Sequence, residues 1–314
     1  MDLTVAIPSR GRPAQLARLL GSLQDQTLDR HQFEVVVGLD GEKLTNQLPE
    51  TRVLELPHQG PAATRNAIIS KARGRLILFL NDDVIADARL LERHLASHGG
   101  LDGPAMVLGS APWVIREPDR LFDRLVRESS MVFFYNRMGT DEPERDWGFR
   151  HAWTLNLSLP TAIAREIPFD ERFALAMFED LEWAWRVQHR TGAPVLFRPE
   201  AIVEHDHRYE PAGYLERERA LGAQARTLAQ INPACAHDIF GCDILDEEYI
   251  RGCRMFLSET DVSALRESFV SLASQSAADW TGPGMDTLYE MYRPLKRWHW
   301  CQGFVAACDS SVAA

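Results

Sequence analysis

The sequence predicts an α/β protein built on a mostly parallel sheet, with a mainly helical C-terminal extension. In about the first hundred residues, short apolar and β-branched runs alternate with amphipathic segments, as expected for strands joined by helices. Glycine and proline residues separate many of these runs. We therefore expect helices on both faces of the sheet, and a ligand site outside the carboxyl ends of its strands.

The individual elements are predicted from hydrophobic periodicity and from turn residues. The first strands are expected at residues 3–8, 33–41, 51–57, 75–80 and 105–111. The helices between them are expected at residues 12–26, 60–74 and 87–99. Later helices are expected at 119–138 and 178–192, and later strands at 152–160 and within 193–209. From about residue 211 the pattern is mainly helical, and the last helix is expected at 285–307.

Composition limits the classes of function. The chain has 314 residues, a net charge of −11 and an isoelectric point near 5.4. Because nucleic acids usually require a basic protein face, we expect no nucleic-acid partner. The N-terminus does not resemble a signal peptide, and no apolar run is long enough to span a bilayer. We therefore expect a cytoplasmic protein whose five cysteines are reduced.

Two adjacent carboxylates, Asp82 and Asp83, follow the apolar strand "LILFL". Like charges gain nothing from burial unless a cation or a set of hydrogen-bond donors compensates them. Capping of the next helix is one interpretation, but Asp87 is better placed for that task. The other interpretation is a site for a hard divalent cation, which binds through one or two carboxylates plus substrate phosphates.

Three further features allow both a structural and a functional interpretation. Glu179 and Asp180 open an amphipathic helix, where they either stabilise its N-terminus or supply a general base. Arg65 opposes the dipole at the start of a helix, which indicates either an anionic partner such as phosphate or a surface salt bridge. His205 and His207 in "VEHDHRY" are either structural, or one of them completes a metal site.

A series of weak motifs occurs in one order along roughly the first 210 residues. The opening is "VAIPSRGRPAQLARLLGSLQDQT", and "EVVVGLDGE", "GPAATRNAI" and "FLNDDV" follow it. The series ends in "NLSLPTAIAREIPFDERFALAMFEDLEWAWR". Together these motifs resemble those of the family 2 glycosyltransferases. The resemblance implies a GT-A type fold, in which a Rossmann-like, mostly parallel sheet flanked by helices binds a nucleotide sugar.

The resemblance also implies roles for individual residues. Asp180 resembles the catalytic base, and Asp83 resembles a ligand of Mn²⁺ or Mg²⁺. His205 matches a histidine that contacts the metal or the diphosphate. The residues implied in nucleotide binding are Pro8, Arg10, Asp40, Arg65 and Asp82. Those implied near the acceptor or the donor sugar are Trp153, Asn156 and Glu179.

Three departures from the family pattern affect the nucleotide end of this site. Leu39 stands where the family often has the first aspartate of "DDGS". Asn81 replaces the first aspartate of the DxD-like motif, which lowers the charge of the site and makes the metal assignment rest mainly on Asp83. Arg10 and Gly11 replace the usual Tyr-Asn, so we expect a guanidinium to stack on the nucleotide base. The identity of the donor is therefore left open.

The implied reaction is inverting transfer of a sugar from a nucleoside-diphosphate sugar to an acceptor hydroxyl. A UDP-sugar is the first expectation for the donor, and the acceptor is a saccharide, a lipid-linked compound or a small molecule. A nucleotidyltransferase is an alternative, although "IPSRGRPAQL" lacks the glycine-rich loop usual there. A Rossmann dehydrogenase would need GxGxxG after the first strand, which is absent. A catalytically inactive nucleotide-sugar-binding protein is the third alternative, which Asn81 keeps open.

Two regions are predicted along the chain. Residues 1–210 form the catalytic domain, with a nucleotide-sugar half at about 1–110 and an acceptor half at about 111–210. Residues 139–150 are a polar loop of the kind that covers active sites. Residues 211–314 form a helical region, in which "YRPLKRWHWCQGF" mixes basic residues with tryptophan. Such a helix packs against its own domain, forms a homo-oligomer, or makes a peripheral contact with anionic lipid.

Overall fold

The computed structural model describes residues 1–43, 50–129, 131–133, 135–139, 142–278, 280–282 and 285–310. The chain divides into two compact units. The α/β unit comprises Met1–Val114 and Arg137–His207, and the helical unit comprises Ile115–Asn136 and Arg208–Ala314. Residues 115–136 thus group with the C-terminal helices, whereas the sequence placed them in the acceptor half. The division into separate domains at residue 210 stays a prediction.

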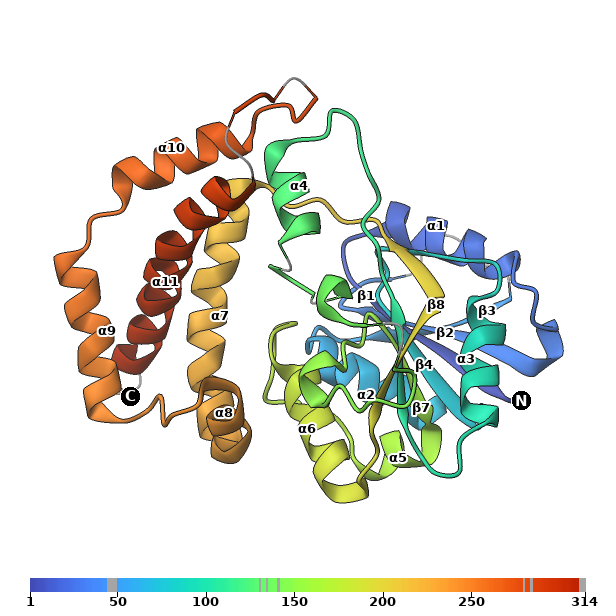
Figure 1. Cartoon of the computed structure of the whole chain (residues 1–314). Coiled ribbons are helices and arrows are strands. Elements are labelled where there is room, and N and C mark those ends of the chain that lie inside the picture. The colour runs from blue at the N-terminus through green and yellow to red at the C-terminus, as the bar shows by residue number, and fades with distance from the viewer. Residues whose placement is uncertain are drawn as a thin grey trace. The chain divides into compact units, whose positions relative to one another are not determined.

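The described residues of the α/β unit form an eight-stranded sheet in the order β3-β2-β1-β4-β7-β6-β8-β5 (Figure 1). The strands are β1 (Leu3–Ser9), β2 (Phe33–Asp40), β3 (Thr51–Leu56), β4 (Leu76–Leu80), β5 (Val84–Ala86), β6 (Met106–Ser110), β7 (Asn156–Pro160) and β8 (Val195–His205). Neighbours from β3 to β4 are parallel, as are β6 and β8. β7 runs antiparallel to both β4 and β6, and β5 runs antiparallel to β8. The predicted α/β class is therefore confirmed, and the carboxyl ends of β1, β2 and β4 meet at one edge.

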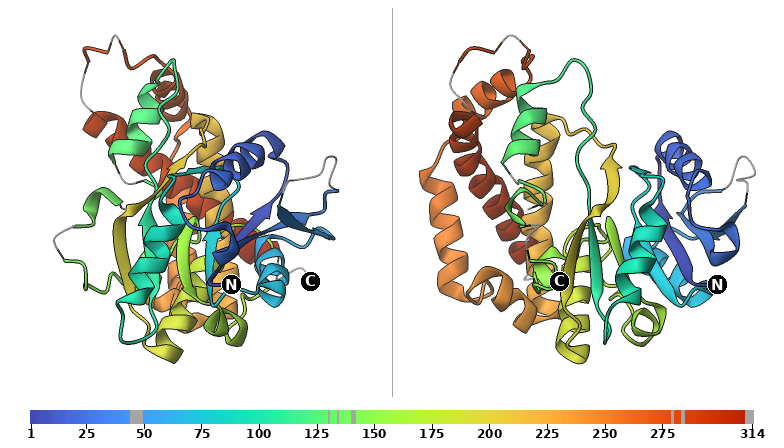
Figure 2. Two further views of the ribbon diagram at one scale, coloured as in Figure 1. Left: turned by 90° about the vertical axis from the view of Figure 1, so that its right-hand side faces the viewer. Right: turned by 45° about the vertical axis from the view of Figure 1, so that its right-hand side comes forward.

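Helices cover both faces of this sheet, as the sequence predicts (Figures 1 and 2). They are α1 (Pro13–Gln24), α2 (Pro61–Lys71), α3 (Leu90–Gly99), α5 (Thr161–Glu166) and α6 (Glu179–Thr191). α1 and α2 both begin with proline, whose fixed φ suits the first helical turn. α1 buries four leucines at helical spacing against the sheet, namely Leu16, Leu19, Leu20 and Leu23. The short elements β5 and α5 were not predicted, because three and six residues are too few to show a period.

The helix predicted at 119–138 is too long. The structure has α4 (Leu121–Glu128), and among the described residues from 129 to 138 the only further helix is the 3₁₀ helix η2 (Tyr135–Arg137). Ser130 and Phe134 lie outside the described residues. α4 buries an apolar face that includes Leu121, Phe122 and Leu125, and the sequence beyond it, "SSMVFF", does not continue that spacing. The predicted loop at 139–150 includes Thr140 and Asp141, which also lie outside the described residues.

The helical unit contains α4 together with α7 (Pro211–Ile231), α8 (Pro233–Phe240), α9 (Glu247–Glu259), α10 (Ser263–Ala273) and α11 (Met285–Ser310). Figure 1 shows α7 and α11 running side by side in the same direction. Two glycines allow their close approach. A Cβ at Gly222 would overlap the carbonyl oxygen of Trp300, and one at Gly303 would overlap that of Arg219. α11 therefore packs against its own unit, one of the three alternatives that the sequence left open.

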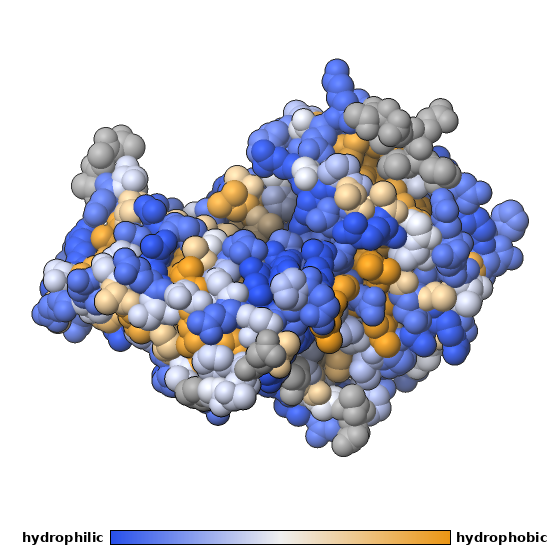
Figure 3. Space-filling view, turned by 90° about the horizontal axis from the view of Figure 1, so that it is seen from above, coloured by the Kyte–Doolittle hydropathy of each residue, from blue (hydrophilic) through white to orange (hydrophobic). Residues whose placement is uncertain are grey.

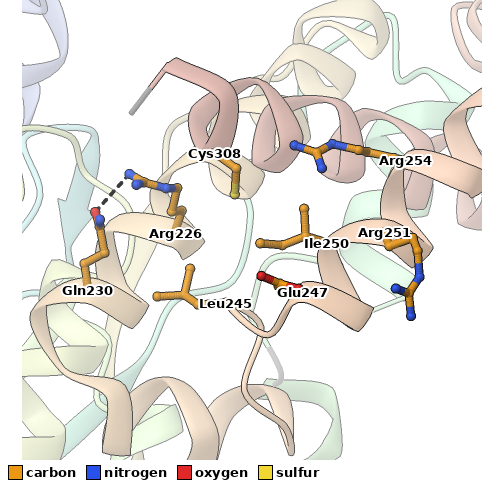
Figure 4. Close-up of a pocket in the computed structure, with 8 residues that line it drawn as sticks. All are labelled: Arg226, Gln230, Leu245, Glu247, Ile250, Arg251, Arg254 and Cys308. Atoms are coloured by element: carbon orange, nitrogen blue, oxygen red, sulfur yellow. Dashed lines mark hydrogen bonds between the residues drawn. The ribbon is translucent and has the colours of Figure 1, made fainter. Parts of the chain in front are cut away.

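The surface of the helical unit carries both charged and aromatic groups. Arg293, Lys296 and Arg297 on α11 are exposed, whereas Trp300 stacks on Phe304 with 5.0 Å between ring centres. A cavity of about 530 Å³ lies among α7, α9 and α11, with Arg226, Gln230, Leu245, Glu247, Ile250, Arg251, Arg254 and Cys308 in its wall (Figure 4). Within the described residues, no helix combines the length and apolar character needed to cross a bilayer.

Polar residues dominate the face seen in Figure 3, with small hydrophobic areas between them. The large apolar side chains lie mainly inside, and β2 and β4 are buried along their whole length. All five cysteines lie within the described residues and are free thiols. The redox state of these cysteines stays a prediction.

Candidate active site

The two carboxylates that follow β4 lie at the sheet edge and are met by an arginine. Asp82 and Asp83 are 0% and 3% exposed. Arg12, in the turn between β1 and α1, contacts both: its Nη2 is 2.5 Å from Oδ1 of Asp82, and its Nη1 contacts Oδ2 of Asp83. The Ser9 hydroxyl donates a hydrogen bond of 2.7 Å to Oδ2 of Asp82. Burial raises the pKa of Asp82 above its ordinary value, and Arg12 and Ser9 offset only part of this effect.

Two histidines face Asp83 from the end of β8. Nε2 of His205 lies 3.8 Å from Oδ1 of Asp83, and Nδ1 of His207 lies 3.2 Å from its Oδ2. Pairing of β5 with β8 sets this arrangement, because Val84 lies opposite His205 in the ladder. Burial acts to raise the pKa of Asp83, but attraction to both histidines and to Arg12 outweighs it and holds that pKa well below its ordinary value. Burial in turn lowers the pKa of His205, although Asp83 attracts its charged form.

The environment of Asp83 fits a divalent cation that takes only some of its ligands from the protein. Oδ1 of Asp83 is buried and has no hydrogen-bond partner within the described residues. Among these residues, no three histidine, cysteine, aspartate or glutamate side chains are arranged to hold one metal ion. One carboxylate with a neighbouring histidine is a small ligand set. It suits Mg²⁺ or Mn²⁺, which keep several waters and take further oxygens from substrate phosphates.

Asp40, at the end of β2, holds the loop that leads into α2. Its Oδ1 accepts a hydrogen bond of 2.7 Å from the backbone N–H of Gln59, and the N–H of Gly60 also points at the carboxylate. Nδ1 of His58 lies 2.9 Å from its Oδ2. Gly60 has φ +90°, and a Cβ there would press against the carbonyl of Ala174. A nucleotide contact by Asp40 stays a prediction.

A second acidic cluster lies at the N-terminus of α6. Nη1 of Arg65 is 2.8 Å from Oε1 of Glu179, and these side chains are 4% and 3% exposed. Asp180 is partly exposed, and its Oδ1 accepts the N–H of Leu181 at 2.9 Å. Burial and the charge of Asp180 raise the pKa of Glu179 to about 7 against the opposing effect of Arg65. Burial also raises the pKa of Asp180.

The residues just before β7 connect the two acidic clusters. The backbone of Thr154 hydrogen-bonds the Asp180 carboxylate, and the carbonyl of the next residue, Leu155, accepts the N–H of Asn81 at 3.4 Å. Asn81 directly precedes Asp82. The predicted base and the predicted metal ligand therefore lie at the same edge of the sheet, on either side of the segment before β7.

The other residues implied by the resemblance occupy different environments. Pro8 is half-buried near the end of β1, Arg10 is exposed, and Trp153 is buried. Asn156 is fully buried, and its Nδ2 donates to the carbonyls of Ala201 at 2.8 Å and Ser110 at 3.1 Å. Its Oδ1 lies 2.9 Å from Nε2 of His94. A sugar contact by Asn156 would require these bonds to break.

Sequence reasoning missed two residues of this site. Arg12 lies within the opening motif, directly before α1, where a basic group at the start of a helix opposes the helix dipole, the same signal that drew attention to Arg65. Trp113 stacks on His205 with 4.2 Å between ring centres. No local signal in the sequence indicates this contact, because it joins two segments about ninety residues apart.

Solved structures share this fold. Mannosyltransferase PcManGT from Pyrobaculum calidifontis, in complex with GDP-Man and Mn²⁺, has a TM-score of 0.54 and 13% sequence identity, covering 99% of this chain and 86% of that one. S. aureus TarS 1–349 in complex with UDP has a TM-score of 0.51 and 15% identity, covering 96% of this chain and 90% of that one. The predicted GT-A type of fold is thereby confirmed.

Sequence comparisons find similarity to one family over part of the chain. Residues 4–156 match the family described as Glycosyl transferase family 2. Validoxylamine A glucosyltransferase of Streptomyces hygroscopicus subsp. jinggangensis is 31% identical over 229 residues, which are 63% of this chain and 54% of that protein. Pre-mycofactocin glycosyltransferase of Mycobacterium tuberculosis is 28% identical over 245 residues, 74% of this chain and 48% of that protein. Residues 4–156 are thus similar to glycosyltransferase family 2, and the chain spans about half the length of these relatives.

Proposed function

We propose that this protein is an inverting, metal-dependent glycosyltransferase that moves a sugar from a nucleoside-diphosphate sugar to an acceptor hydroxyl. The observation that supports the proposal is the placement of Asp180. Its partly exposed carboxylate lies at the same sheet edge as the buried Asp82–Asp83 pair, with Thr154 and Leu155 between them. Asp180 can therefore act on the acceptor while the Asp82–Asp83 pair lies near the leaving diphosphate.

In the proposed reaction, the acceptor oxygen forms a bond to the anomeric carbon. The bond from that carbon to the diphosphate oxygen breaks, and its electron pair leaves with the diphosphate. Asp180 accepts the acceptor's proton as the oxygen attacks. A carboxylate with a raised pKa is a stronger base than an ordinary one, and burial raises the pKa of Asp180. A single displacement of this kind inverts the configuration of the anomeric carbon.

The leaving group needs positive charge near it. Asp83, with His205 beside it, would hold a divalent cation, and such a cation neutralises charge on a departing diphosphate when it is bound. Arg12 is the positive group that the chain itself supplies at that position. Arg65 is engaged with Glu179, so its predicted contact with phosphate would require exchange of that partner.

The comparisons support the class of donor but not its base. One structural neighbour was solved with UDP and another with GDP-Man. A UDP-sugar remains our first candidate, and a GDP-sugar is the second. Two relatives are named for validoxylamine A and for pre-mycofactocin, which supports a small-molecule acceptor beside the saccharide and lipid-linked alternatives.

Incubation with a panel of UDP- and GDP-sugars and Mn²⁺ tests the proposal. We expect release of nucleoside diphosphate with at least one donor, and loss of that release in Asp180→Asn with nucleotide affinity nearly unchanged. Asp102→Asn, which changes an exposed loop residue of the same unit, is the control. Full activity of Asp180→Asn would exclude this residue as the base. Nucleotide-sugar binding without turnover in the wild type would favour an inactive binding protein.

A further inference from the structure

We propose that Arg12 is an internal counter-ion that occupies the Asp82–Asp83 pair in the nucleotide-free protein and must leave when a divalent cation binds. This inference rests on the proposed function, because it assumes a cation site at Asp83. It adds a coupling to that function: the metal and the diphosphate strengthen each other's binding, since each favours the displacement of Arg12.

The contacts show which partner is able to move. Asp82 and Asp83 are 0% and 3% exposed, whereas the Arg12 side chain is 36% exposed. Asp82 is held by the Ser9 hydroxyl, and Asp83 is flanked by two histidines. The carboxylates are therefore fixed, while the guanidinium reaches them from the half-exposed start of α1. A rotation of the Arg12 side chain releases the pair without movement of the sheet.

Arg12 and a metal ion compete for the same charge. The planar guanidinium uses its two terminal nitrogens on two different carboxylates, the fork geometry that suits arginine. A divalent cation at Asp83 would lie close to this guanidinium in a site that excludes most water. Like charges repel strongly under these conditions, so both cations cannot keep full contact with Asp83.

A displaced Arg12 has a new partner in the diphosphate. Guanidinium groups bind phosphate oxygens with two parallel hydrogen bonds, and such charge-assisted bonds are strong. Metal alone has to displace Arg12 into water, whereas metal with a nucleoside diphosphate displaces it onto an anion. Binding of metal should then strengthen binding of nucleotide, and by linkage nucleotide should strengthen binding of metal by the same factor.

Binding of Mn²⁺ to the full chain, followed by the electron paramagnetic resonance signal of the free ion at pH 8, tests the inference. Without nucleotide, we expect Arg12→Gln to bind Mn²⁺ at least about tenfold more tightly than the wild type. Arg12→Lys should lie between them, because an ammonium keeps the positive charge but lacks the planar fork that gives each carboxylate its own nitrogen. With UDP or GDP present, the gain in Mn²⁺ affinity should be large in the wild type and smaller in Arg12→Gln.

Arg18→Gln is a matched control. Arg18 lies on α1, which begins directly after Arg12, is exposed, and pairs with the buried Asp206 next to His205. Its loss removes the same charge from the region but leaves the Asp82–Asp83 pair covered, so we expect a much smaller change in Mn²⁺ affinity. Thermal melting of each variant establishes that it is folded, and Arg12→Lys carries the test if Arg12→Gln does not fold.

The outcomes separate this inference from the proposed function. Equal Mn²⁺ affinities of the wild type and the two Arg12 variants, or an equal increase in Arg18→Gln, would overturn the role of Arg12 while the metal-dependent reaction stands. If no variant bound Mn²⁺, with or without nucleotide, the metal site itself would be wrong. Both proposals about metal would then fall together.

Discussion

Arg65 of α2 and Glu179 of α6 form a buried ion pair, with 2.8 Å between Nη1 and Oε1, directly beside Asp180. The two residues are 114 positions apart in the chain. Their contact ties the helix that carries the proposed base to the helix that follows β3. It also surrounds Asp180 with one positive and one negative group, so that changes to either neighbour alter its affinity for a proton.

Breaking this ion pair should destabilise the protein strongly. Loss of one partner leaves the other charge buried without compensation, which typically costs about 3–5 kcal/mol. We therefore expect Glu179→Ala to lower the unfolding free energy by about that amount, as measured by urea unfolding. The double variant Arg65→Met/Glu179→Leu should recover most of the loss, because an apolar pair of similar volume needs no counter-charge. A loss below about 1 kcal/mol in Glu179→Ala would mean that water reaches this pair.

Stability should also depend on pH through Glu179. Its pKa of about 7 lies above the ordinary value of 4.5, so folding favours the protonated form. The resulting stabilisation is complete below pH 4.5 and is lost as the pH rises through 7. Glu179→Gln removes this group, so the melting temperature of the wild type minus that of the variant should fall between pH 5 and pH 8. Glu200→Gln, which removes an exposed carboxylate on β8, is the control.

Much of the fold was predictable because its signals are local. Apolar runs followed by Asp40 and by Asp82 located two strand ends, and the parallel arrangement of β1, β2 and β4 brings those ends to one edge. The helix predicted at 119–138 failed because α4 shows the periodicity only as far as Glu128. β5 was not predicted because a strand of three residues is too short to show alternation of apolar and polar side chains.

The partners within the site were less predictable, since they are far apart in the chain. The sequence raised the question of what compensates Asp82 and Asp83, and the structure answers with Arg12, about seventy residues earlier. Arg65 was expected at a phosphate or a surface salt bridge, yet it meets Glu179 in the interior. Charge alone indicates that a partner is needed, and only the topology of the sheet determines which one lies within reach.

Removal of metal should affect nucleotide binding through Asp83. We expect calorimetry to show that Mn²⁺ increases the affinity for UDP or GDP, and that EDTA reverses the increase. Asp83→Asn should lose at least about tenfold of the Mn²⁺-dependent part, because the amide is a weaker ligand than the carboxylate. Affinity without metal should change little. Asp206→Asn, which alters the neighbouring Arg18 pair, should retain the Mn²⁺ effect. Loss of the effect in both variants would indicate a general disturbance of this edge.

Asn156 offers a test that separates a structural role from a sugar contact. Its amide joins the backbones of Ser110 and Ala201 and the ring of His94 in the core. Three lost hydrogen bonds at about 1 kcal/mol each, with a buried ring nitrogen left unpaired, should make Asn156→Ala about 3 kcal/mol less stable. For a protein of this size, that corresponds to a decrease in melting temperature of several degrees. If the residue is purely structural, the KM values for donor and acceptor stay within about twofold at temperatures where the variant is folded. A tenfold rise in KM without loss of stability would instead place a sugar against this amide.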